Sequence, residues 1–103
     1  MRERDVEKKL VEGVRGLGGM ACKWVCPGRD GVPDRIIFLP GGQVRFVELK
    51  TEAGKLSSRQ VYMIAKLRSL GCQVQVLYGE ADVKRFIETL RMEVALSDPS
   101  ERR

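Results

Sequence analysis

Two short apolar segments on either side of a glycine pair constrain this chain more than any other feature. Residues 35–39 and 44–47 are rich in β-branched and aromatic side chains, and Pro40, Gly41 and Gly42 lie between them. Such segments favour β-strands, and glycine readily adopts the positive φ that a tight turn requires. The sequence therefore predicts an antiparallel hairpin.

The register of this hairpin decides which charged side chains meet. Because side chains alternate across a strand, Glu48 and Lys50 project from one face and Leu49 from the other. A two-residue loop would turn Asp34 away from Glu48, whereas a three-residue loop over residues 40–42 would place Asp34 opposite Glu48. We predict the three-residue loop, with one glycine in the left-handed conformation.

Two carboxylates held this close suggest a metal site. Asp34 and Glu48 would repel each other unless a proton or a cation lay between them, and a hard cation with oxygen ligands is the usual solution. The alternative is that Asp34 ends a turn while Glu48 pairs with Lys50 on an exposed sheet face. From an acid-x-Lys pattern alone, this structural alternative is the favoured interpretation.

The composition restricts the chemistry that the chain can perform. Histidine is absent, which excludes histidine bases, histidine metal ligands and Ser-His-Asp hydrolysis. Catalysis would therefore use carboxylates, lysine, water and metal. Cys22, Cys26 and Cys72 lack paired CxxC spacing, which argues against a disulfide framework and a structural zinc site. We expect them to be buried small apolar residues.

Length and charge bound the class of protein. The 103 residues are expected to form one domain over residues 1–91, followed by a flexible tail over 92–103, where helical periodicity is lost. No apolar run of about eighteen residues and no secretory signal is present. We therefore expect a cytoplasmic protein with no membrane partner. The net charge of +5 is compatible with a polyanionic partner, but alone it is weak evidence.

Periodicity predicts the remaining elements. Helices are expected at 3–17, 57–70 and 80–90, and strands at 20–25 and 72–78. Ser57 and Gln60 have the spacing of a capping box, and Val61 and Ile64 begin the apolar repeat of the second helix. A strand that follows a helix must enter the sheet by a crossover. We therefore expect an α/β fold in the order αβββαβα, with a mixed central sheet flanked by helices.

The first helix carries an acidic residue on its apolar face. Glu7 lies within the arc formed by Val6, Leu10 and Val14, where a carboxylate is unfavourable unless it is paired. Periodicity favours a boundary residue bonded to a lysine, either Lys23 or Lys50. A functional role is the alternative.

The combined pattern resembles the virus-type replication-repair nuclease family, VRR-NUC, of the PD-(D/E)xK superfamily. Pro33-Asp34 followed by Glu48-Leu49-Lys50 matches the nuclease motif, and the likeness extends over roughly residues 3–90. It implies a restriction-endonuclease-like core. The further matching residues are Gly28, Gly31-Val32, Arg35, Gly41-Gly42, Phe46-Val47, Gly54-Lys55-Leu56-Ser57 and Gln60.

The resemblance also implies a metal centre. Asp34 and Glu48 would hold Mg²⁺ or Mn²⁺ with the backbone carbonyl of Leu49, and Glu7 would point into the site and bind a second ion or water around the first. Glu3 is a less favoured match than Glu7.

Two more residues have roles by the same resemblance. Lys50 would orient the attacking water or stabilise the developing negative charge. Gln60 would lie near the active site. Some relatives place an aromatic residue four positions after this glutamine, where this chain has Ile64.

These residues together predict a metal-dependent DNA endonuclease without a small-molecule cofactor. No recognition helix is evident in the sequence, so structure-selective cleavage of branched DNA, such as four-way junctions, is favoured over sequence-specific cutting. Stand-alone relatives imply a homodimer. We expect phosphate contacts from Lys23, Arg29, Arg35, Lys55 and Arg59.

Two other functions are compatible with the sequence. One is a small nuclease subunit of a restriction or repair complex, whose partner supplies specificity. The other is a noncatalytic nucleic-acid-binding module in which the acids are structural. Trp24 is interpreted as a core or sheet-face residue, and stacking on a base is its less favoured role.

Overall fold

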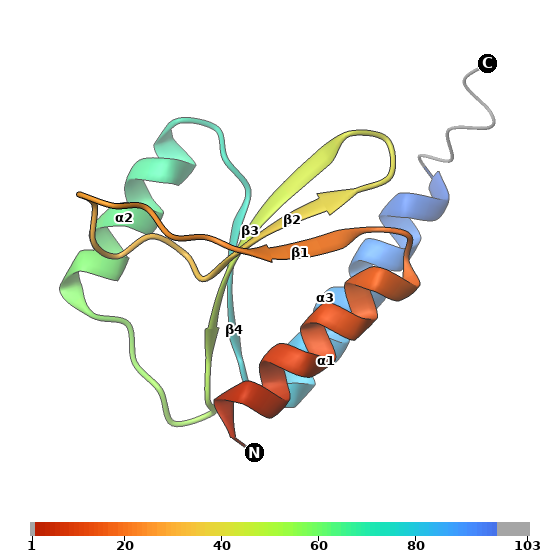
Figure 1. Cartoon of the computed structure of the whole chain (residues 1–103), viewed down its shortest axis with the longest axis horizontal. Helices are drawn as coiled ribbons and strands as arrows, with labels where there is room; N and C mark the ends of the chain where they lie inside the picture. Colours follow the sequence, from red (N-terminus) through yellow and green to blue (C-terminus); the bar gives the residue numbers. More distant parts are fainter. Residues whose placement is uncertain (1, 97–103) are drawn as a thin grey trace.

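The computed structural model describes residues 2–96, and its elements follow the predicted order (Figure 1). A central four-stranded sheet has the strand order β1-β2-β3-β4; the first three strands are antiparallel, and β3 and β4 are parallel. The predicted mixed α/β sheet is therefore confirmed. The elements are α1 (Glu3–Gly16), β1 (Met20–Lys23), β2 (Arg35–Leu39), β3 (Gln43–Lys50), α2 (Ser58–Ser69), β4 (Val74–Tyr78) and α3 (Gly79–Leu96).

The hairpin between β2 and β3 has the predicted register. Leu39 pairs with Gln43, so residues 40–42 form a three-residue loop. Gly41 and Gly42 both have positive φ, at 86° and 77°, and the prediction of one left-handed glycine is wrong. Glycine is the residue that adopts positive φ at little cost, so the loop can use this conformation twice in succession.

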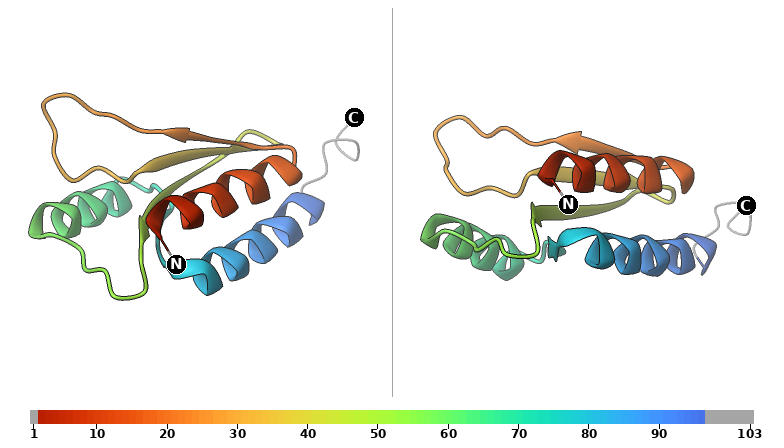
Figure 2. Two further views of the ribbon diagram at one scale, coloured as in Figure 1. Left: turned by 60° about the horizontal axis from the view of Figure 1, so that its bottom comes forward. Right: turned by 90° about the horizontal axis from the view of Figure 1, so that it is seen from below.

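The two faces of the sheet carry different layers. α1 and α3 run side by side over one face, and α2 lies on the opposite side (Figure 2). Leu49 is buried in the core beneath α1 and α3, whereas its neighbour Glu48 bonds with Gln60 of α2. The main core is apolar throughout: Val6, Leu10, Val14, Ile37, Leu39, Val47, Leu49, Leu77, Val83, Phe86, Ile87 and Leu90.

The second helix begins with the predicted capping box. The backbone N–H of Gln60 donates to Ser57 Oγ at 3.1 Å, and the backbone N–H of Ser57 donates to Gln60 Oε1 at 2.9 Å. Met63 and Ile64 are buried, but Val61 is 54% exposed, which corrects its predicted place on the apolar face. The inward face starts at the polar Gln60, and hydrophobicity alone does not reveal it.

The third helix extends to Leu96, so the predicted tail from 92 to 103 starts too early. Val94 packs against the core. Glu93 bonds with Arg45 at 2.7 Å, and the side chain of Arg45 is only 8% exposed. The packing of Val94 and the ion pair of Glu93 with this buried guanidinium both stabilise the last turns of the helix. The rest of the predicted tail lies outside the described residues.

Several smaller expectations are also corrected. Cys22, Cys26 and Cys72 are free thiols that are half-buried, not fully buried. β1 ends at Lys23 and β4 begins at Val74, so both strands are shorter than predicted. Between residues 2 and 96, no helix is long and apolar enough to cross a membrane.

The loop between β1 and β2 packs tightly against the start of α2. Gly31 has a φ of 85°, and a Cβ placed there would lie 2.5 Å from the carbonyl oxygen of Arg59. Gly28 has a similar φ of 84°, but a Cβ there would meet no atom within 4 Å. A side chain at either glycine would strain the backbone, but only a side chain at Gly31 would also collide with α2.

We expect Gly31→Ala to destabilise the protein more than Gly28→Ala. Both variants carry the penalty of a left-handed residue, about 1–2 kcal/mol, but only Gly31→Ala also forces the loop away from α2. Thermal unfolding of both variants would measure the difference. Equal losses of stability would contradict this close contact between the loop and the helix.

Candidate active site

The hairpin brings Asp34 and Glu48 to one face of the sheet. Arg35 pairs with Val47, so the antiparallel register sets Asp34 opposite Glu48. Asp34 is further fixed because its Oδ2 accepts a hydrogen bond from the backbone N–H of Leu49 at 2.9 Å. The chain therefore places two carboxylates side by side at the end of the paired region.

Glu48 is almost fully buried, with 2% of its surface exposed. Its Oε2 accepts a hydrogen bond from Gln60 Nε2 at 3.0 Å and lies 3.6 Å from Lys50 Nζ. Its Oε1 is buried without a hydrogen-bond partner. The alternative of an exposed Glu48–Lys50 pair is wrong about exposure, although the two residues do interact.

Burial alters the acidity of Glu48. The pKa of Glu48 is raised from 4.5 to about 7, chiefly by burial and also by the negative charge of Asp34, whereas Lys50 opposes the shift. Glu48 therefore gains from a proton or a cation at its unpartnered oxygen. A bound cation could supply that charge.

The available ligands suit a hard divalent cation. The unpartnered Oε1 of Glu48 and the carboxylate of Asp34 supply oxygen atoms, and the carbonyl of Leu49 points to the same strand edge as its N–H. Within residues 2–96, no group of three or more His, Cys, Asp or Glu side chains could hold a metal. A cation here would thus rest on two carboxylates, a carbonyl and water.

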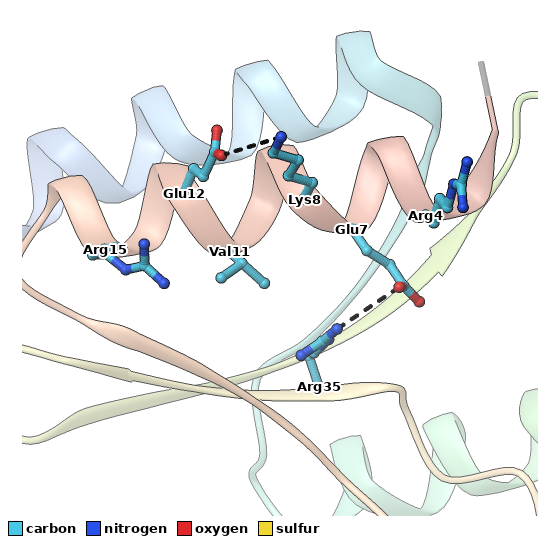
Figure 3. Close-up of a pocket in the computed structure, with 7 residues that line it drawn as sticks. All are labelled: Arg4, Glu7, Lys8, Val11, Glu12, Arg15 and Arg35. Carbon is cyan, nitrogen blue, oxygen red and sulfur yellow. Dashed lines mark ion pairs between the residues drawn. The ribbon is translucent and has the colours of Figure 1, made fainter.

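Glu7 lies away from this pair. Its Oε2 is 3.8 Å from Arg35 Nη2 (Figure 3). The predicted lysine partners are therefore wrong. Arg35, the first residue of β2, follows Asp34 directly, and its side chain points to the opposite face of the sheet, toward α1. The structure does not bring Glu7 together with Asp34 and Glu48, and its role as a ligand stays a prediction.

The predicted DNA-binding cations differ in accessibility. Arg35 is 12% exposed, and its Nε is buried without a partner. It lies at a hollow on α1 that also carries Arg4, Lys8 and Arg15, which sequence reasoning did not single out. Arg4 and Lys8 are four positions apart, and Lys8 and Arg15 are seven apart, so all three lie on one face of the helix. This spacing was the sequence signal that could have identified them. The other predicted cations are exposed: Lys23, Arg29, Lys55 and Arg59.

The mixed sheet, with a buried acid and a lysine on β3 and a second acid beside them, has the restriction-endonuclease-like fold of a nuclease domain of known structure. Residues 6–81 match the VRR-NUC domain family, and the chain belongs to it. This confirms the resemblance noted in the sequence. As a nuclease domain, it binds nucleic acid.

Two relatives support this assignment. The phage protein "Putative nuclease p44", from Acyrthosiphon pisum secondary endosymbiont phage 1, is 49% identical over 77 residues, which span 75% of this chain and 83% of the relative. A solved VRR_NUC domain structure has a TM-score of 0.79 and 34% identity, covering 84% of this chain and 94% of its own.

The raised pKa of Glu48 predicts a pH-dependent stability without metal. The folded protein holds a proton on Glu48 up to about pH 7, whereas the unfolded chain releases it near 4.5. The stabilising contribution is therefore complete below pH 4.5 and is lost as the pH rises through 7. Glu48→Gln should remove this part of the pH dependence.

Urea unfolding in EDTA across this pH range would measure the effect. Glu88→Gln is a suitable control because the Glu88 side chain is 68% exposed, and it should retain the wild-type pH dependence. An unchanged slope in Glu48→Gln would contradict the assignment to Glu48.

Proposed function

We propose that this domain is a metal-dependent, structure-selective endonuclease that hydrolyses phosphodiester bonds in branched DNA such as four-way junctions. One observation carries the proposal. The hairpin register holds Asp34 beside a buried Glu48 whose Oε1 has no partner, and Lys50 lies 3.6 Å from the other oxygen of Glu48.

Asp34, Glu48 and the carbonyl of Leu49 would hold Mg²⁺ or Mn²⁺. Such an ion lowers the pKa of bound water and offsets negative charge in the transition state. Gln60 fixes the orientation of Glu48 by donating to Oε2. Lys50 is anchored by Glu48 and would orient the attacking water or offset charge on the phosphate.

Exposed cations at the end of β1, in the two loops that follow β1 and β3, and at the start of α2 favour contacts with the DNA backbone. Lys23, Arg29, Lys55 and Arg59 are all exposed, and phosphate contacts of this kind position DNA without reading its sequence. We propose that they hold a branched substrate by its shape.

A homodimer would supply two active sites for the symmetric strands of a four-way junction. Met20, Phe38 and Val44 lie directly opposite one another on three neighbouring strands, and they are 56%, 41% and 37% exposed. This exposed apolar row supports the proposal as a surface for contacts between subunits. The molar mass in solution, measured by light scattering, would test it.

We expect Lys50→Ala to reduce cleavage of a four-way junction by about 10²–10³-fold while retaining DNA affinity. Cleavage should require Mg²⁺ or Mn²⁺ and stop in EDTA, and linear duplex should be cut more slowly than the junction. A labelled-junction assay combined with equilibrium binding would measure both effects. Lys84→Ala, a distant lysine on α3, is the matched control. Metal-independent binding with no cleavage of any substrate would refute the nuclease proposal.

Glu7 can be tested separately. If Glu7 binds a second ion or ordered water, Glu7→Gln should weaken Mn²⁺ binding and slow cleavage. Glu12→Gln provides a control on the same helix, because Glu12 pairs with Lys8 at the surface. Full metal affinity and rate in Glu7→Gln would reduce Glu7 to a structural partner of Arg35.

A further inference from the structure

A hollow of about 230 Å³ lies between α2 and the loop that follows β1. Its walls are mainly apolar and include Trp24, Val32, Met63 and Leu67, and Leu70 adds a side chain that is 71% exposed. A closed apolar cavity of roughly 150 Å³ accommodates benzene. The hollow is therefore large enough to receive one aromatic ring system.

Trp24 forms a firmly held wall of this hollow. Its backbone N–H donates to the carbonyl of Asp34 at 2.8 Å. Its ring packs against Phe46 with a centroid separation of 5.3 Å and an interplanar angle of 45°. A ring fixed in this way can stack on a ligand with little loss of side-chain freedom.

The Trp24 wall of the hollow lies beside the carboxylate pair. Lys23 pairs with Arg35, so the next residues, Trp24 and Asp34, lie opposite each other. Side chains at directly opposite positions share a face, with Cβ atoms about 5 Å apart. A base stacked on Trp24 would therefore lie near a phosphate bound at Asp34 and Glu48.

The rim of the hollow is positively charged. Arg29 and Lys66 are exposed and line it from the loop and from α2. An apolar, aromatic floor with a cationic rim is complementary to a nucleobase whose flanking phosphates remain in water. The cationic rim favours a nucleic acid over an apolar protein segment as the ligand of this hollow.

We propose that this hollow receives an unstacked nucleobase from the branch point of the DNA, next to the phosphate to be cut. This inference rests on the proposed function and deepens it. Extruding a base from an intact duplex requires a few kcal/mol, and the requirement is smallest where the base is already unpaired. Occupancy of the hollow would therefore favour branched over linear DNA.

The chain has a single tryptophan beside two tyrosines, so fluorescence excited selectively at tryptophan reports on Trp24 and this hollow. In EDTA, where cleavage is blocked, we expect a four-way junction to quench Trp24 fluorescence, and an equally long duplex to do so much less. A junction with abasic sites at the branch should lose the quenching. Because the readout is binding, it is independent of whether the protein cleaves DNA.

Variants test the same contact by affinity. Trp24→Ala should weaken junction binding by about 5- to 150-fold, the range for loss of one base stack. Leu70→Gln avoids the core and should also weaken binding to the junction. Val61→Gln is its matched control, since Val61 is exposed on α2 but does not line the hollow.

Three results would overturn the inference. These are equal quenching by junction and duplex, unchanged quenching by the abasic junction, and equal junction affinity in Leu70→Gln and Val61→Gln. A fluorescence change with protein concentration in the absence of DNA would instead assign the hollow to a second copy of the chain. If the wild-type protein shows the expected quenching but cleaves no DNA, only the nuclease proposal is refuted.

Discussion

The pairing register of β2 and β3 is the constraint on which the site depends. It sets Asp34 opposite Glu48, and burial makes this proximity electrostatically unfavourable without a counter-charge. Gln60 and Lys50 contact Oε2 of Glu48, whereas Oε1 is buried without a hydrogen-bond partner. Such a partly satisfied buried acid is a departure from optimal stability that functional sites often show.

The alternation of side chains then assigns different tasks to the two faces of the sheet. Asp34 and Glu48 face α2, whereas Arg35 faces α1 and meets Glu7. The adjacent residues Asp34 and Arg35 therefore lie in separate electrostatic environments. On one face, α2 contacts Glu48 through Gln60 and borders the apolar hollow together with the loop that follows β1. On the other face, α1 and Arg35 form the second hollow.

Much of this arrangement could be predicted because its causes are local. The glycine-containing turn fixed the register, and the Ser57–Gln60 spacing fixed the start of α2. Contacts between distant elements were harder to predict. Periodicity placed Glu7 among lysines but could not identify Arg35 as its partner, and it ended the last helix before Glu93 because the need of buried Arg45 for a partner is visible only in three dimensions.

The side chain of Gln60 links the start of α2 to the orientation of Glu48. Its side-chain oxygen accepts from Ser57 at the helix start, and its side-chain nitrogen donates to Glu48. Each amide atom has one chemically suitable partner, so the orientation of the amide is determined. The acid is consequently aligned only in molecules whose α2 has formed its first turn. An incompletely folded chain would lack this alignment, and the same contact that starts a helix also confines the aligned site to the folded state.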